Sequence, residues 1–415
     1  MTQTSPSLPT VAYPWLALLL TTTAQIMASI AMTTPSVLAP VVAPALGFAP
    51  QSIGIFVSAV YLAAIFSGLI GGHYVRQFGA LRLSQAAMVL VALGLLVIAT
   101  GLPMLVLLAT TAIGIGYGLT NPTAAQILSD HTPARSRGLF FSVKQTGVPI
   151  GVALAGLLVP LFLGWWSWRG AIIAISLLIA CELLLLAPFR NRFDANREAI
   201  KLHWAAVLTR PLLRVLSDPP LRRLAICSSC YSGTQVCFLT FLVSDLKLER
   251  GFSLAAAAGA LATAQITSIA ARPFWGVITD RYVAPGILLG LLGLGMAAAL
   301  VLFGMLPAHT SLVWVVSAAM LVAATVVGWN GVYFAGLAQH ARPHEIAMIT
   351  GGTQFLTFGG AMIGPLLFAA GVTALDSYSQ TFMLFALAPF AMGIWLLLEE
   401  KKRVRDTRTK TRQRY

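Results

Sequence analysis

The sequence contains few charged residues. Asp, Glu, Lys and Arg make up only 10% of its 415 residues, whereas about a quarter of an ordinary soluble domain is charged. Hydrophobic residues make up 58%, and the mean hydropathy is +0.83. Apolar stretches of roughly 20 residues, the length that crosses a bilayer, recur along the chain and leave no room for a soluble domain between them. The composition therefore excludes an ordinary soluble protein and indicates an integral membrane protein.

Patterns that would indicate catalysis or metal binding are also missing. Of the four cysteines, Cys227 and Cys230 form a CxxC pair. This pair has no partner pair and begins an apolar stretch, which favours small buried side chains over zinc or redox chemistry. The six histidines show no metal spacing, and GIGYG (114–118) lacks the lysine and serine of a phosphate-binding loop. We predict no enzymatic activity, no cofactor and no bound metal.

The apolar stretches predict an all-α protein with twelve membrane-spanning helices. They lie near residues 14–36, 51–74, 83–101, 103–128, 139–163, 168–189, 222–244, 253–279, 285–306, 310–338, 346–372 and 380–398. The first stretch is too long for a cleaved signal peptide, and the residues before it lack the basic segment of such a peptide. We expect it to remain attached.

The distribution of Lys and Arg predicts that both termini are cytoplasmic. In that orientation cytoplasmic segments hold 22 of the 27 Lys and Arg residues, and external loops hold Arg169, Lys247 and Arg250. Lys and Arg collect on the cytoplasmic side of membrane proteins. Topology and lipid headgroups thus account for the net charge of +14, and nucleic-acid binding is not expected. The expected location is the inner (cell) membrane.

One long basic connection divides the spans into six and six. It predicts a first bundle at 1–189, a linker at 190–221, a second bundle at 222–398 and a basic tail at 399–415. The two halves resemble each other. GHYVRQFG (72–79) follows the second span and GVITDRYV (276–283) follows the eighth, while QTGVPIGVALAG (145–156) and TQFLTFGGAMIG (353–364) lie in the fifth and eleventh. The nearly equal spacing of both pairs indicates a duplicated six-helix unit.

GVITDRYV resembles the loop motif of the major facilitator superfamily, in which a glycine is followed four and five residues later by Asp–Arg. With the span count, the long middle loop and the duplication, the resemblance covers the whole chain. It implies two six-helix bundles related by a pseudo-two-fold axis, and a secondary transporter. The first copy departs from the motif, with Arg76 and Gln77 in place of Asp–Arg.

The motif residues are candidates for a cytoplasmic gate. Glycine lets helices approach closely in lipid, and an acid near a helix end can pair with a cation of a neighbouring span. The gating candidates are Gly72, Arg76, Gly79, Gly276, Asp280 and Arg281. The alternative is that these charges only set the topology.

Two cations lie inside spans. Arg272 precedes Asp280 by eight residues and is therefore roughly 12 Å deeper on the same helix, too deep to reach the interface fully. Of thirteen acids only Glu182 lies well inside a span, so the partner of Arg272 is expected to be an anionic substrate. ARPFWG (271–276) also resembles the eighth helix of monocarboxylate, oxalate and cyanate carriers, which implies that Arg272 binds the anion. Lys144 lies at a similar depth in the fifth span and could add a second charge.

Each cation has an alternative explanation. Arg272 could form a fixed pairing with an acid or with carbonyls of a neighbouring helix, and Lys144 could extend to the cytoplasmic interface. Polar and aromatic side chains within the spans nevertheless predict a polar cavity, although each alone is more typical of a bond between helices. These candidates are Gln25, Tyr117, Asn121, Gln126, Gln145, Gln265, Trp329, Asn330 and Tyr333.

The favoured function is secondary transport of a small organic anion, a mono- or dicarboxylate, by alternating access. One alternative is a proton-driven drug exporter, which needs an intramembrane carboxylate, and a non-transporting sensor is another. Glu182 is the only candidate for such a carboxylate and for proton coupling. The expected partners are the anion, the lipid bilayer and a co-transported proton or exchanged anion.

Overall fold

The computed structural model describes residues 13–133, 137–194, 204–340 and 346–412, and this part of the chain is helical with no strand. It confirms the all-α prediction. Within these residues, twelve helical stretches are long and apolar enough to cross a membrane. Arg135 and Arg342, and parts of the predicted linker and tail, lie outside the described residues.

The first six spans are formed mainly by seven α-helices. These are α1 (Pro14–Ala45), α2 (Ile53–Phe78), α3 (Ala80–Ala99), α4 (Val106–His131), α5 (Arg137–Gln145), α6 (Gly147–Trp165) and α7 (Trp168–Leu186). The short 3-10 helices η1 (Pro50–Ser52) and η2 (Pro103–Leu105) precede α2 and α4. The short 3-10 helix η3 (Ala187–Phe189) ends the predicted first bundle, and the predicted linker contains α8 (Arg190–Phe193) and α9 (Trp204–Ser217). The limits of the domains stay a prediction.

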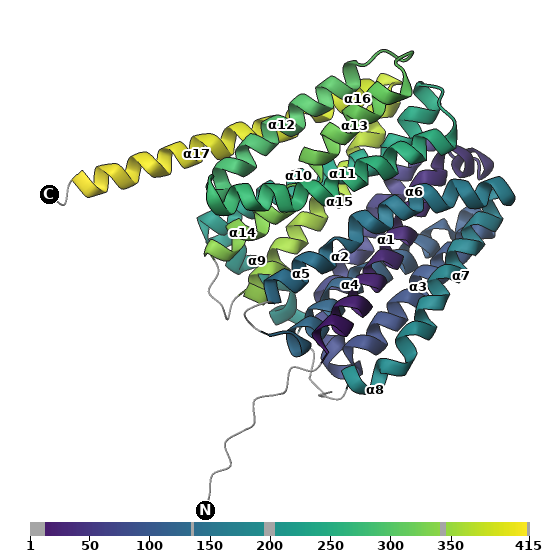
Figure 1. Cartoon of the computed structure of the whole chain (residues 1–415), viewed down its shortest axis with the longest axis horizontal. Coiled ribbons are helices and arrows are strands. Elements are labelled where there is room, and N and C mark those ends of the chain that lie inside the picture. Colours follow the sequence, from purple (N-terminus) through teal and green to yellow (C-terminus); the bar gives the residue numbers. More distant parts are fainter. Residues whose placement is uncertain (1–12, 134–136, 195–203, 341–345, 413–415) are drawn as a thin grey trace, which may run out of the picture.

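The second six spans begin with α10 (Pro219–Ser244), which continues into a π-helical turn, η4 (Asp245–Glu249). They continue with α11 (Leu254–Arg281), α12 (Pro285–Met305), α13 (Leu312–Val326), α14 (Asn330–His340), α15 (Ile346–Leu375), α16 (Tyr378–Phe385) and α17 (Leu387–Arg412). The last of these projects beyond its neighbours (Figure 1).

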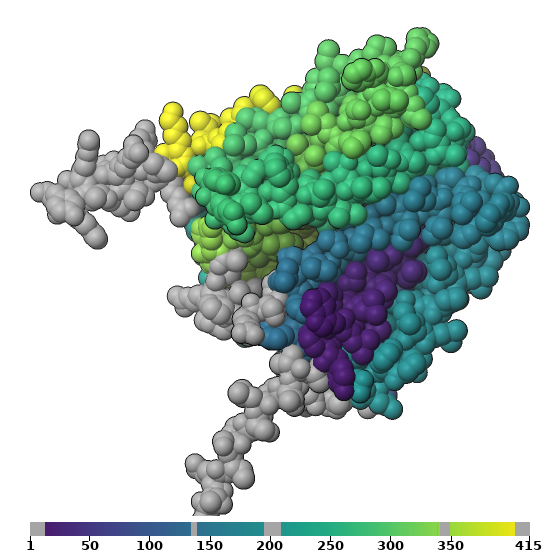
Figure 2. Space-filling model, in the orientation of Figure 1, coloured from purple at the N-terminus to yellow at the C-terminus, as the bar shows by residue number. Residues whose placement is uncertain are grey.

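The helices form two bundles that meet along a seam. Figure 1 shows α1–α7 on one side and α10–α17 on the other, and Figure 2 shows the two halves in contact along the seam. Across it, α2 packs on α15, α6 on α11 and α1 on α10. The α2–α15 contact joins the second span to the eleventh, and the α6–α11 contact joins the fifth to the eighth. A pseudo-two-fold axis exchanges these two contacts, as the duplication predicts.

Small residues allow the bundles to approach closely. A Cβ added to Gly156 would lie 2.7 Å from the Ala258 carbonyl oxygen, and one added to Gly54 would lie 2.3 Å from that of Pro365. In lipid, close packing of small residues is a main source of helix association. Large apolar side chains such as Leu107 and Leu184 are exposed on the outside, where a bilayer would cover them.

Two spans that the sequence analysis treats as continuous are broken. The fifth divides at Thr146 between α5 and α6, and the tenth divides at residues 327–329 between α13 and α14. The break in the fifth span has a local cause. Pro149 has no amide hydrogen, so it cannot bond to the Gln145 carbonyl four residues earlier. Both breaks lie beside Arg272, as described next.

Candidate substrate site between the two bundles

Lys144 lies in the last turn of α5, and its side chain is 2% exposed. Its Nζ atom donates hydrogen bonds to Gln25 Oε1 on α1 at 2.6 Å and to Asn121 Oδ1 on α4 at 2.9 Å. Lys144 makes no ion pair with an acid in the described part of the chain. The side chain is therefore enclosed among neutral oxygens and does not extend to the interface.

Arg272 lies on α11 and reaches the broken ends of two other helices. Its Nη1 donates to the Gln145 carbonyl at 3.0 Å, and its Nε lies 3.4 Å from the Val327 carbonyl. The first carbonyl ends α5 in the opposite bundle, and the second follows α13. A cation at a helix C-terminus is favourable because the helix dipole is negative there. These bonds are the carbonyl pairing foreseen as the alternative for Arg272, but they leave three of its five N–H groups without a partner among the described residues.

A chain of hydrogen bonds extends from Arg272 to α10. The Val327 carbonyl also accepts from Asn330 Nδ2 at 3.2 Å. Asn330 Nδ2 and Trp329 Nε1 both donate to Gln235 Oε1, at 3.2 and 3.0 Å. Gln235 was missed by the sequence analysis, although a glutamine within the apolar seventh span was the signal that could have revealed it.

A cavity lies beside this chain of hydrogen bonds, and neither Lys144 nor Arg272 is among the residues that line it. It has a volume of about 60 Å³ and is lined mainly by α1, α2, α4, α6 and α10, including Ser29, Thr33, Tyr61, Tyr117 and Gln235. Ser29 accepts a long hydrogen bond from Gln25, the partner of Lys144. Ligand pockets commonly have roughly 300–1,000 Å³. The bundles must therefore separate here before a small organic molecule can enter.

Aromatic rings from both bundles meet at the cavity. The ring centroids of Tyr61 on α2 and Tyr117 on α4 are 6.0 Å apart, and Phe358 on α15 lies 5.5 Å from Tyr61 and 6.4 Å from Tyr117. Tyr117 lies one helical turn before Asn121, the hydrogen-bond partner of Lys144, on the same face of α4. The rings therefore lie near Lys144.

Some predicted site residues lie elsewhere. Gln126 bonds to Asp130 on the exposed side of α4. Gln265 is fully buried, its Oε1 accepts from Ser268, and its Nε2 has no partner in the described part of the chain. Tyr333 packs edge-on against Trp329.

Glu182 on α7 is buried, and its Oε1 accepts a hydrogen bond from Thr23 on α1 at 2.7 Å. It is not among the residues that line the cavity. Its role in proton coupling stays a prediction.

The gating candidates are not engaged in this conformation. Asp280, Arg281 and Arg76 are exposed, and none has a hydrogen bond or an ion pair within the described residues. A Cβ added to Gly72 or Gly276 would meet no atom within 4 Å, so neither glycine lies at a close helix contact here. Gating by these residues stays a prediction.

Gly79 lies at a tight turn between α2 and α3. Its φ of +100° is one that residues with side chains rarely adopt, and a Cβ there would lie 2.4 Å from the Asp194 side chain. Asp194 accepts from the Leu81 and Arg82 amides at 2.8 and 3.1 Å and so caps the start of α3. The first loop motif has Arg76 where the second copy has an aspartate, and Asp194 places a carboxylate beside the end of this motif.

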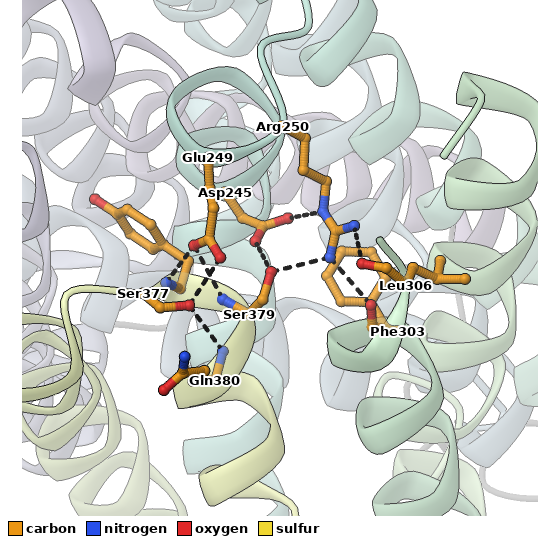
Figure 3. A network of polar contacts seen from close by, with 9 residues as sticks. Asp245, Glu249, Arg250, Phe303, Leu306, Ser377, Ser379 and Gln380 are labelled. Carbon is orange, nitrogen blue, oxygen red and sulfur yellow. Dashed lines mark hydrogen bonds and ion pairs between the residues drawn. The ribbon is translucent and has the colours of Figure 1, made fainter. Parts of the chain in front are cut away.

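A second buried polar network joins the ends of α10, α12 and α16 (Figure 3). Arg250 pairs with Asp245 at 2.9 Å and donates to the Phe303 and Leu306 carbonyls at the end of α12. Glu249 accepts from the Ser377 hydroxyl and from two amides that begin α16. The sequence analysis placed Arg250 in an external loop and missed that Asp245 is buried. All of these residues belong to the second bundle, so the network braces one bundle internally.

The twelve apolar helical stretches of the described residues form two bundles, with two basic side chains and two broken helices between them, and together these features define a membrane transport protein. The family model of the Major Facilitator Superfamily matches residues 21–365. The chain belongs to this superfamily and is a multi-pass secondary transporter, not an enzyme.

Several relatives carry organic anions. The chain is 23% identical to the gallate transporter of Pseudomonas putida, over 96% of this chain and 94% of that protein. It is 26% identical to the 3-(3-hydroxy-phenyl)propionate transporter of Escherichia coli (strain K12), over 88% and 89%. Two relatives from Arabidopsis thaliana match only in part. Sugar transport protein 12 is 32% identical over 35% of this chain and 29% of that protein. A probable inositol transporter is 29% identical over 56% of this chain and 40% of that protein.

The solved structures support the fold alone. The nucleoside transporter NupG superposes with a TM-score of 0.74 at 15% identity, and the match covers 93% of this chain and 99% of that one.

Proposed function

We propose that the chain carries a small organic anion, a carboxylate attached to an aromatic ring, across the inner membrane by alternating access, with both termini in the cytoplasm. The observation that carries this proposal is a pair of basic side chains at the seam, the buried Lys144 and the partly buried Arg272, of which neither forms an ion pair in the described part of the chain. Buried charges in membrane proteins are normally paired. An anionic cargo supplies the missing charge.

The two cations differ in what they offer a carboxylate. Arg272 presents a planar fork with unused N–H groups, which suits two-point binding of a carboxylate. Lys144 offers a compact charge from the other bundle. The anion would thus contact both bundles at once. Because Arg272 also bonds to the Gln145 carbonyl across the seam, an anion on Arg272 competes with a contact that holds the bundles together.

The aromatic part of the proposal rests on Tyr61, Tyr117 and Phe358. Their rings lie in edge-on and tilted pairs, and Tyr61 and Tyr117 line the cavity, an arrangement into which another ring can pack favourably. The names of the relatives from Pseudomonas putida and Escherichia coli agree with such a cargo. The drug-export alternative needs an intramembrane carboxylate in the substrate site, and Glu182 instead bonds to Thr23 on α1.

Stabilisation of the purified protein by gallate tests this proposal. Removing one partner of a buried charge pair costs about 2–5 kcal/mol, so Arg272→Ala should weaken gallate binding by more than tenfold. Arg272→Lys should restore little of the lost gallate affinity, because lysine lacks the planar guanidinium that binds a carboxylate at two points. Lys144→Ala should weaken the binding of a dicarboxylate more than the binding of a monocarboxylate. The measurement is the rise in melting temperature across a gallate titration.

Arg169→Ala is the matched control, because this exposed arginine stacks on Trp168 away from the seam. Equal stabilisation by gallate of wild type and a well-folded Arg272→Ala variant would refute the anion site. Raised drug tolerance of cells that express the chain, without carboxylate exchange, would favour the exporter.

A further inference from the structure

The surroundings of Lys144 carry an inference that rests on the proposed function and specifies its coupling. We propose that the Lys144 amine binds the proton that travels with the anion, so that the chain is an electroneutral proton–anion symporter. The proton carrier is then a lysine within the substrate site, and no carboxylate is needed for coupling.

The hydrogen bonds of Lys144 fit both protonation states. Its two partners, Gln25 Oε1 and Asn121 Oδ1, are side-chain oxygens that the amine approaches as a donor. A neutral amine has two hydrogens and one lone pair, whereas an ammonium has three hydrogens. The two bonds therefore persist in both states, and only the third position changes. That position holds a lone pair in the empty carrier and an N–H bond to the anion in the loaded one.

Charge favours the neutral amine when the site is empty. Burial of an ammonium without a counter-ion costs several kcal/mol, and Lys144 is 2% exposed with no acid paired to it in the described ranges. Arg272, which bonds to the carbonyl of the adjacent Gln145, adds a second positive charge to the same site. Arg272 itself stays charged because a guanidinium is not deprotonated in proteins. A bound carboxylate favours the ammonium form of Lys144 over the neutral amine, so the proton and the anion bind together.

The other groups around Lys144 do not replace it in this role. The helices α1 and α4 present Gln25, Asn121 and Tyr117, and α6 presents Val148 to the cavity. Asp130 of α4 is exposed and bonded to Gln126. Glu182 bonds to Thr23, which lies two residues before Gln25 and so faces another side of α1. Among the described residues, Lys144 is thus the group in the site whose charge can change with loading.

The charge balance determines how transport responds to voltage. With a neutral Lys144, the empty site carries one positive charge, from Arg272. Loading adds one proton and one monoanion, so the net charge of the site is the same empty and loaded. The loaded and the empty reorientation therefore move equal charge in opposite directions, and no net charge crosses the membrane in one cycle. On release the carboxylate leaves, and the proton leaves Nζ for water on the same side. A permanently charged lysine would instead make the transport of a monoanion electrogenic.

Proteoliposomes containing the whole chain separate this inference from the proposed function. Counterflow exchange of labelled gallate without gradients tests the anion site alone. A pH gradient at clamped potential should then drive gallate accumulation beyond that of protein-free liposomes, and a potential alone should drive none. Absence of exchange would refute the proposed function and the inference with it. Exchange without a response to the pH gradient would refute only the inference.

Three variants assign the proton to a residue. Lys144→Arg keeps a permanent charge, so it should exchange gallate more weakly, lose the response to the pH gradient and respond to potential. Lys144→Gln should also lose the response to the pH gradient. Glu182→Gln is the control and should accumulate gallate as the wild type does. Accumulation on a pH gradient by Lys144→Arg, or its loss in a folded Glu182→Gln variant, would overturn the assignment.

A measurement on the wild type alone guards against variants that do not fold. Gallate added to the purified protein in weak buffer should be accompanied by proton uptake that approaches one proton per bound anion over part of a pH series. A pH indicator reports the uptake. Binding of gallate without proton uptake at any pH of the series would exclude Lys144 as the proton carrier.

Discussion

Pro149 lies four residues after Gln145 and removes the amide hydrogen that would otherwise bond to the Gln145 carbonyl. Arg272 supplies the missing donor from the opposite bundle. This pairing explains why an arginine is stable so deep in an apolar helix without an acid beside it. It also leaves a bond between the bundles that an anion can displace, so binding and movement become coupled at one residue.

Phe358 should contribute to selectivity for a ring. It is the member of the aromatic group that comes from the second bundle. An aromatic pair contributes about 0.5–1.5 kcal/mol beyond buried area, so Phe358→Leu should weaken gallate binding about twofold to tenfold. Binding of an aliphatic carboxylate should change little. Competition against labelled gallate by a series of ring-bearing and aliphatic carboxylates measures the difference.

Phe66→Leu is the matched control, since Phe66 lies on α2 like Tyr61 but is 57% exposed on the outside. An equal loss of affinity for ring-bearing and aliphatic anions in Phe358→Leu would show that the ring shapes the cavity without contacting the aromatic part of the cargo.

At the scale of helices, the network around Arg250 ties three helix ends together. Its partners are the Asp245 carboxylate, two carbonyls that end α12 and the Ser379 hydroxyl. Loss of one partner of a buried ion pair costs about 3–5 kcal/mol, so Arg250→Ala should lower the melting temperature of the detergent-solubilised protein strongly. Lys247→Ala, which changes the neighbouring cation, should lower it little. Similar melting temperatures for the two variants would contradict a bracing role.

The helical spans could be predicted because they depend on the amount of apolar sequence, which is a local property. The breaks could be predicted only in part. Pro149 marks the first, but the turn at 327–329 depends on tertiary contacts such as Trp275 Nε1 with the Ala324 carbonyl. Lys144 and Arg272 were found because charge is rare in such a chain. Gln235, Asp194 and Asp245 were missed because their roles depend on partners that are distant in sequence.

At the scale of the whole molecule, the bundles are closed at one end of the seam. Gly54 packs against Pro365, and Gly156 packs against Ala258. All four lie in the halves of their helices nearer the predicted external side. At the opposite end the gating candidates Asp280 and Arg281 are exposed and have no partner in the described part of the chain. If they form a latch, it must act in the other conformation, in which the cytoplasmic ends approach.

Asp280→Asn should therefore slow transport without abolishing binding. The change removes a charge that has no partner in the present conformation, so it should leave this state intact and destabilise the alternative. We expect gallate exchange in proteoliposomes to slow several-fold, while the gallate affinity measured by thermal stabilisation changes by no more than a few-fold.

Asp376→Asn is the control, because Asp376 is exposed between α15 and α16, and its left-handed backbone also suits asparagine. A large loss of affinity with unchanged exchange would place Asp280 in contact with the substrate. Unchanged exchange and affinity would leave Asp280 and Arg281 as charges that only set the topology.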